Sequence, residues 1–180
     1  MELESRLRLI HLDTLQVGVW LNARKDPTPA QWTEACAKLA ASVRVADDAI
    51  SRHRLFVVSD GGSPSAAQRK ELFDEALRGH PVPTAVINKA MANPVRRGMA
   101  LAMNLLKPNY RVFEPRDVLR ALDHIGVASM RFDAIWKTLR FLQGSLPPVE
   151  TLRLIATELN LPVEPLRPSQ IPPSSRPPPT

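Results

Sequence analysis

Short apolar runs alternate with amphipathic stretches along the first 127 residues of the chain. The clearest run is Leu55 to Val58, where four consecutive apolar residues indicate a strand buried on both faces. Between such runs, apolar residues recur every three or four positions, which is typical of a helix with one buried stripe. We expect strands at residues 7–12, 16–21, 55–58, 84–87 and 110–113.

Four of the expected helices start with a residue followed by proline. Proline suits the first helical position because its φ is already fixed and its missing N–H is not needed there. A preceding Ser, Thr or Asn can accept a hydrogen bond from the first turn. The pairs are Thr28-Pro29, Ser63-Pro64, Asn93-Pro94 and Glu114-Pro115.

The resulting order is β-β-α-β-α-β-α-β-α. A short connection makes the first two strands antiparallel neighbours, whereas helical crossovers make the later strands parallel. We therefore predict an α/β domain over residues 1–127 with a mostly parallel five-stranded sheet. A C-terminal helical extension of two helices is expected at 128–160. Residues 161–180 are expected to form a disordered proline-rich tail, since proline removes backbone donors and stops helices.

The turn after the 55–58 strand carries the candidate site. It consists of Asp60, Gly61, Gly62 and Ser63, with Ser65 two residues further on. In open α/β folds, ligands and partners bind beyond the carboxyl ends of the strands. Two interpretations stay open: the glycine amides bind an anion at a helix start, or the glycines permit a tight turn that Ser63 caps.

Known catalytic and nucleotide motifs are absent from this turn. It matches neither of the glycine-rich nucleotide-binding patterns nor the GxSxG elbow of hydrolases. Asp60 as a phosphoacceptor would need an acidic pair after an earlier strand, where only Asn22 and Asp26 stand. The four histidines are dispersed without ligand spacing, so we expect no metal and no cofactor.

The order of elements resembles that of the STAS domain, found in anti-sigma-factor antagonists and sulfate-transporter tails. STAS switch proteins carry a phosphorylatable serine in an Asp-Ser-Ser-Gly-like turn, at the start of the helix after the third strand. Here that region reads SDGGSPSAAQ, with Ser63 and Ser65 in the corresponding neighbourhood. The resemblance covers about residues 5–127 and implies partner binding through this face.

The first helix of the extension carries a second candidate surface. Phe132, Trp136 and Leu139 form one apolar stripe beside arginines. The stripe either packs back onto the α/β domain or acts as an interaction helix for a partner or a second copy, since aromatic residues and arginine are enriched at interfaces.

Composition and charge add the cellular context. The single cysteine excludes an internal disulfide and fits a reducing compartment. No signal peptide and no apolar run of bilayer length are evident, so we expect a cytoplasmic protein without a membrane span. The net charge of +6 allows weak, salt-sensitive binding to nucleic acid or a membrane surface, but no feature indicates specific nucleic-acid recognition.

These observations favour a non-enzymatic regulatory or scaffolding module that binds a protein partner near Asp60–Ser65. The alternative is a small enzyme or anionic-ligand-binding protein that uses the Asp60-Gly61-Gly62-Ser63 turn, with Asp60 as general base. Partner identity, homo-oligomer formation and phosphorylation of Ser59, Ser63 or Ser65 are left open.

Overall fold

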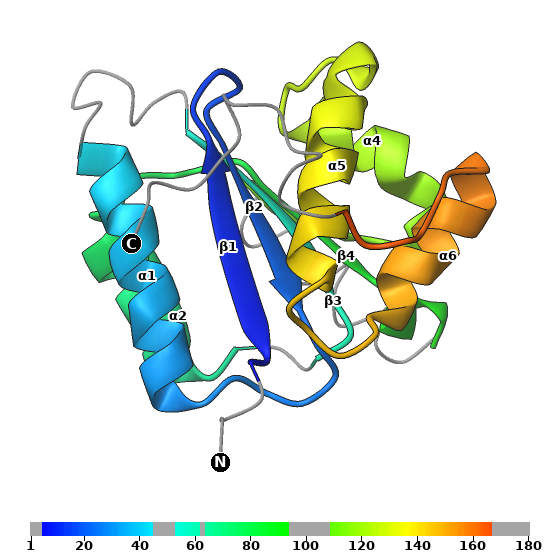
Figure 1. The fold of residues 1–180 in the computed structure, drawn as a ribbon. Coiled ribbons are helices and arrows are strands. Elements are labelled where there is room, and N and C mark those ends of the chain that lie inside the picture. The colour runs from blue at the N-terminus through cyan, green and yellow to red at the C-terminus, as the bar shows by residue number, and fades with distance from the viewer. Residues whose placement is uncertain (1–4, 45–52, 62–63, 94–108, 167–180) are drawn as a thin grey trace.

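The computed structural model describes residues 5–44, 53–61, 64–93 and 109–166. A five-stranded sheet lies between two layers of helices (Figure 1). The strands follow one another across the sheet in chain order: β1 Leu7–Leu12, β2 Val17–Asn22, β3 Arg54–Ser59, β4 Thr84–Asn88 and β5 Tyr110–Phe113.

The sheet is mixed, not mostly parallel as expected. β1 pairs antiparallel with β2, so that Leu7 lies opposite Asn22, while β2, β3, β4 and β5 are parallel neighbours. The reversal comes from a tight turn in which the amide of Leu15 donates to the carbonyl of Leu12. The predicted antiparallel first pair is thereby confirmed, and it makes β1 the edge strand that gives the sheet its mixed character.

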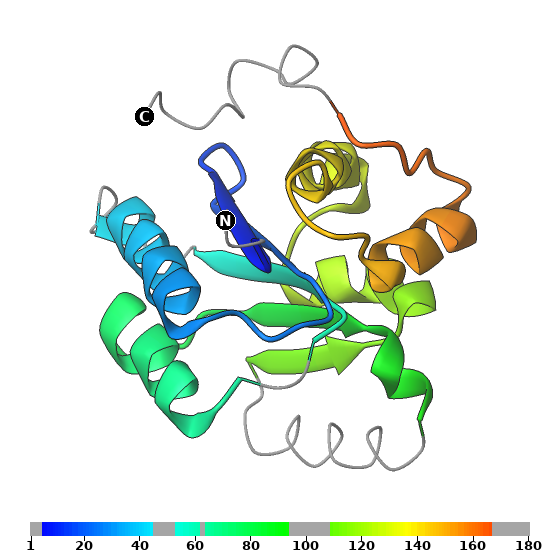
Figure 2. The same cartoon turned by 60° about the horizontal axis from the view of Figure 1, so that its bottom comes forward.

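The helices divide between the two faces of the sheet, which Figure 2 shows nearly edge-on. On one face lie α1 (Pro29–Arg44) and α2 (Ala66–Lys70), which continues as a π-helical segment, Glu71–Ala76. On the other lie α4 (Val118–His124), α5 (Phe132–Gln143) and α6 (Glu150–Leu159). Short 3₁₀ segments occupy Lys89–Ala92, Pro115–Asp117 and Ser129–Arg131. The helix expected after Asn93-Pro94 lies outside the described residues.

Local sequence explains where the helices begin. Thr28 Oγ1 accepts a hydrogen bond from the amide of Gln31 at 3.3 Å, and Gln31 Oε1 accepts one from the amide of Thr28 at 3.3 Å. Such a capping box satisfies two donors that the first turn of a helix leaves free. The same arrangement at Ser65 and Gln68 starts α2.

β3 is buried on both faces, as its apolar run predicts. Phe56 and Val58 belong to the core under α4, α5 and α6, whereas Leu55 belongs to the core under α1 and the π-helical segment. The strand therefore separates two hydrophobic cores, and its carboxyl end emerges between the two helical layers.

The two helices expected as an extension, α5 and α6, complete the core on the side of the sheet that α4 covers. Ile135, Leu139, Leu152 and Ile155 are fully buried, and they share one cluster with Phe56 of the sheet. Residues 128–160 thus form the outer layer of the α/β fold and are not an appendage to it. No helix in the described part of the chain is long and apolar enough to cross a membrane.

Two histidines stack inside the fold near the start of β3. The rings of His11 and His53 lie 4.6 Å apart between centroids and 6° from parallel. His11 Nδ1 lies 2.7 Å from Asp13 Oδ1, while Nε2 of each ring is buried without a hydrogen-bond partner. Burial lowers the pKa of His53 to about 4, and the nearby His11 and Arg54 act in the same direction.

This burial predicts acid sensitivity. The unfolded chain takes up a proton at His53 near pH 6.5, but the folded chain does so only near pH 4. Stability should therefore be complete above pH 6.5 and fall as the pH decreases toward 4, with a loss of about 2 kcal/mol between pH 7.5 and 5.

Urea unfolding at several pH values between 7.5 and 5 measures this loss. His53→Phe keeps an aromatic ring against His11 but cannot titrate. The free energy of unfolding of this variant should therefore depend much less on pH. If the free energy of unfolding of His53→Phe falls with pH as steeply as that of the native chain, the acid sensitivity does not come from His53.

Candidate functional site

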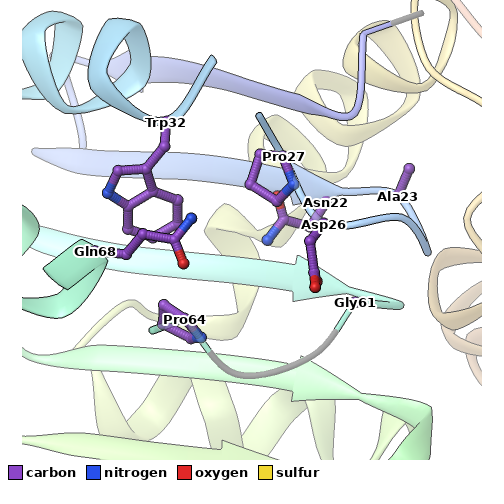
Figure 3. Close-up of a pocket in the computed structure, with 8 residues that line it drawn as sticks. All are labelled: Asn22, Ala23, Asp26, Pro27, Trp32, Gly61, Pro64 and Gln68. Carbon is purple, nitrogen blue, oxygen red and sulfur yellow. The ribbon is translucent and has the colours of Figure 1, made fainter. Parts of the chain in front are cut away.

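The loops after β2 and β3 meet at the carboxyl ends of these two parallel strands and form a shallow depression (Figure 3). It is lined by Asn22, Ala23, Asp26, Pro27, Trp32, Gly61, Pro64 and Gln68. Figure 3 shows the Trp32 indole at one end and the Asp26 carboxylate directed toward Gly61 at the other. The space of about 280 Å³ includes open solvent, and its enclosed part is too small for an ordinary small-molecule ligand.

Asp60 follows β3 as predicted, but its carboxylate does not line this depression. It caps α6 instead. Oδ2 accepts a hydrogen bond from the amide of Glu150 at 2.6 Å, and Oδ1 accepts from the amide of Thr151 at 2.8 Å and its hydroxyl at 2.6 Å. The side chain is 3% exposed, and Lys89 Nζ lies 3.7 Å from Oδ2. Both carboxylate oxygens are thus engaged within the fold.

This role removes Asp60 from the solvent-facing site. A general base or phosphoacceptor must reach its substrate, whereas this carboxylate is buried beneath α6. The sequence signals only part of this: Val149 occupies the N-cap position of α6 and offers no capping group, so the free amides of that helix need an acceptor from elsewhere, but the sequence does not identify Asp60 as that acceptor.

Gly61 is also used structurally. Its amide donates to Ser59 Oγ at 3.1 Å, and its carbonyl accepts from Asn88 Nδ2 at 3.1 Å. A Cβ atom at this position would lie 3.2 Å from the carbonyl oxygen of Ala23, so glycine permits the two loops to approach closely. The Gly61 amide is therefore not open to an anion. Gly62 and Ser63 lie outside the described residues.

Ser65 is the predicted site residue that faces solvent. Its Oγ accepts a hydrogen bond from the amide of Gln68 at 3.2 Å, which makes it the N-cap of α2. Ala66 and Ala67 follow it and are exposed, and no residue of α2 is buried. The first turn of α2 thus forms an accessible surface beside the depression. Here the serine has a capping role, and its hydroxyl proton remains available.

The proposed interaction helix is buried. Phe132, Trp136 and Leu139 are 7%, 3% and 0% exposed, and they pack within the core formed by α4, α5, α6 and the sheet. Of the two interpretations of this stripe, packing back onto the α/β domain is therefore the one that the structure shows, and these three residues do not form a free interaction surface. Amphipathic spacing identifies a buried stripe but not what covers it.

The Cys36 thiol has a structural role, because it is buried in the core under α1. Burial raises the pKa of the Cys36 thiol to about 12, and Glu71 and Glu75 add to the effect, so this thiol remains protonated. Among the described residues, no three His, Cys, Asp or Glu side chains gather in a way that could hold a metal ion.

No protein-family model, curated protein or solved structure matches this chain. The interpretation of the site therefore depends on its geometry.

The cap supplied by Asp60 should contribute strongly to stability. Asp60→Ala removes the acceptor of three hydrogen bonds and leaves the first amides of α6 without a partner. We expect a loss of about 2–4 kcal/mol in the free energy of unfolding, because both a helix cap and buried polar contacts disappear. Urea unfolding measures the loss, and hydrogen exchange at Glu150 and Thr151 localises it.

Asp26→Ala is the matched control at the same rim. Asp26 is exposed, so its removal should change stability by less than about 0.5 kcal/mol. Equal stabilities of the two variants would show that Asp60 does not anchor α6.

Proposed function

We propose that the chain is a non-enzymatic regulatory or scaffolding module, which binds a protein partner through the corner between β3 and α2. This corner comprises Ser65, Ala66 and Ala67 together with the rim of the depression, Pro64 and Gln68. The observation that carries the proposal is that no residue of α2 is buried and that Ser65, Ala66 and Ala67 at its start are exposed, beside the carboxyl ends of two parallel strands.

The shape of the corner suits a macromolecular partner better than a small ligand. The depression is shallow, and the residues next to it are small and exposed, so another protein surface can approach the backbone closely. Trp32 and Pro27 add apolar lining, while Asn22, Asp26 and Gln68 supply polar groups at the edge. Interfaces between proteins likewise combine apolar and polar groups.

The element order supports the same proposal. An antiparallel β1–β2 pair leads into parallel strands joined by helices, as in the STAS-like arrangement that the sequence resembles. In that arrangement, the start of the helix after the third strand is the partner-binding region, and α2 holds this place here. Ser65 is the exposed serine of the region among the described residues, and a phosphate there would place negative charge at a partner-binding edge.

The alternative of an enzyme or anion-binding protein has less support. It assigns Asp60 as general base and the glycine amides as an anion site, but Asp60 caps α6 and the Gly61 amide donates to Ser59. These hydrogen bonds favour structural roles for both groups.

A charge-bearing substitution at the corner tests the proposal. Ala67 is exposed on α2, and arginine is compatible with a helix, so Ala67→Arg should leave the fold intact while blocking close approach of a partner. We expect proteins that co-purify with the native chain to be reduced at least tenfold with Ala67→Arg, measured by quantitative mass spectrometry.

Ala37→Arg provides the matched control, because Ala37 is an exposed alanine of α1. This variant should retain the associations. Both variants should have the same midpoint of denaturant unfolding as the native chain. If Ala67→Arg keeps every association that the native chain makes, the corner is not the binding surface.

A further inference from the structure

The segment after α6 runs back along α5 as an extended strap. Asn160 ends α6 with a φ of 51°, and residues 161–166 then continue without helix or strand. Figure 1 shows this orange-to-red segment crossing from α6 toward α5. The strap belongs to the helical layer on the opposite face of the sheet from α2, so it is separate from the corner proposed above.

Successive turns of α5 hold the strap through its main chain. Trp136 Nε1 donates to the carbonyl of Pro162 at 3.2 Å, and Arg140 Nε donates to the carbonyl of Glu164 at 2.7 Å. The amide of Leu166 in turn lies 3.4 Å from the carbonyl oxygen of Arg140. That carbonyl is in the last turn of α5, where helices leave acceptors unpaired.

The spacing of these contacts matches an extended peptide to a helix. Trp136 and Arg140 are one turn apart, a rise of about 6 Å. Pro162 and Glu164 are two residues apart, which spans about 6 Å in an extended, proline-type conformation. One turn further on, at the Gly144 C-cap of α5, a Cβ would lie 3.5 Å from Cβ of Pro165, an ordinary van der Waals distance, so the strap also passes close to the end of the helix.

The strap is held by its main chain and by its apolar side chains. Leu161 and Val163 pack against the core, and Leu166 is half-buried, whereas Pro162, Glu164 and Pro165 are exposed. The prolines restrict the chain to an extended form and reduce the entropy lost on docking. The face of α5 therefore recognises main-chain groups and a few apolar side chains, which is how proteins recognise extended peptides.

We propose that this face of α5, lined by Trp136, Arg140 and Gly144, is a docking groove for an extended proline-containing peptide of a partner protein. Residues 161–166 occupy it in cis and are displaced by a segment of the pattern apolar–Pro–apolar–x–Pro–apolar. The strap leaves α6 at Asn160, whose left-handed conformation lets the chain change direction without altering the helix.

A strap-released full-length chain tests the groove directly. Val163→Asp combined with Leu166→Asp places charge on the inward side of the strap and should free the groove. The probe is a fluorescent synthetic peptide with the sequence of residues 160–168. We expect it to bind the released variant at least tenfold more tightly than the native chain, because the attached strap competes at an effective concentration of about millimolar.

Two matched controls define the recognition. The same peptide with aspartate in place of Val163 and Leu166 should not bind. Arg140→Gln in the released variant should weaken binding several-fold, since the guanidinium donor to the peptide carbonyl is lost. Failure of the native-sequence peptide to bind a folded released variant would overturn the proposal.

Hydrogen exchange on the native chain keeps the test independent of any variant. The Trp136 indole N–H and the Leu166 amide should exchange through local opening, much faster than the amides of β3. Exchange of both groups only on global unfolding would overturn the proposal. Concentration-dependent dimers of the native chain with a protected indole N–H would indicate strap exchange between copies and would also overturn a partner peptide as the occupant.

Discussion

The placement of the C-terminal layer depends on one buried carboxylate. Asp60 stands at the end of β3, the strand between the two cores, and it binds the amides of Glu150 and Thr151 in α6, which lie 90 and 91 residues later in the chain. A carboxylate at the start of a helix satisfies free donors and complements the helix dipole. Because Thr151 also contacts the Ser59 carbonyl and accepts from the amide of Lys89, the start of α6 is tied to the ends of both β3 and β4.

Local signals in the sequence predict most of the elements, because their physical causes are local. The apolar run at Leu55–Val58 and the capping box at Thr28 and Gln31 need only neighbouring residues, and both occur as expected. The role of Asp60 was not predictable in the same way, because its partners come from a distant helix. The same limit explains the Phe132, Trp136 and Leu139 stripe, whose periodicity shows that it is buried but not that the sheet covers it.

The candidate site illustrates this limit at a smaller scale. Strand order correctly places the β3–α2 turn at the carboxyl edge of the sheet, and Ser65 emerges there on the surface. Which groups of the turn remain free depends on packing: Asp60 and the amide of Gly61 are engaged, while the first turn of α2 stays exposed. A polar residue at a strand end thus indicates a position, and its hydrogen-bond partners decide between a structural and a binding role.

The Asp60 cap also determines what can move in the C-terminal layer. The cap holds the N-terminal end of α6, whereas the strap leaves from the C-terminal end of the same helix. Undocking residues 161–166 would break three long-range hydrogen bonds to α5 but none of those to Asp60. The fully buried side chains of α6, including Leu152 and Ile155, would also keep their contacts. A helix anchored at its start and by its apolar face can therefore release the segment that follows it, with the loss of the contacts that Leu161 and Val163 make with the core.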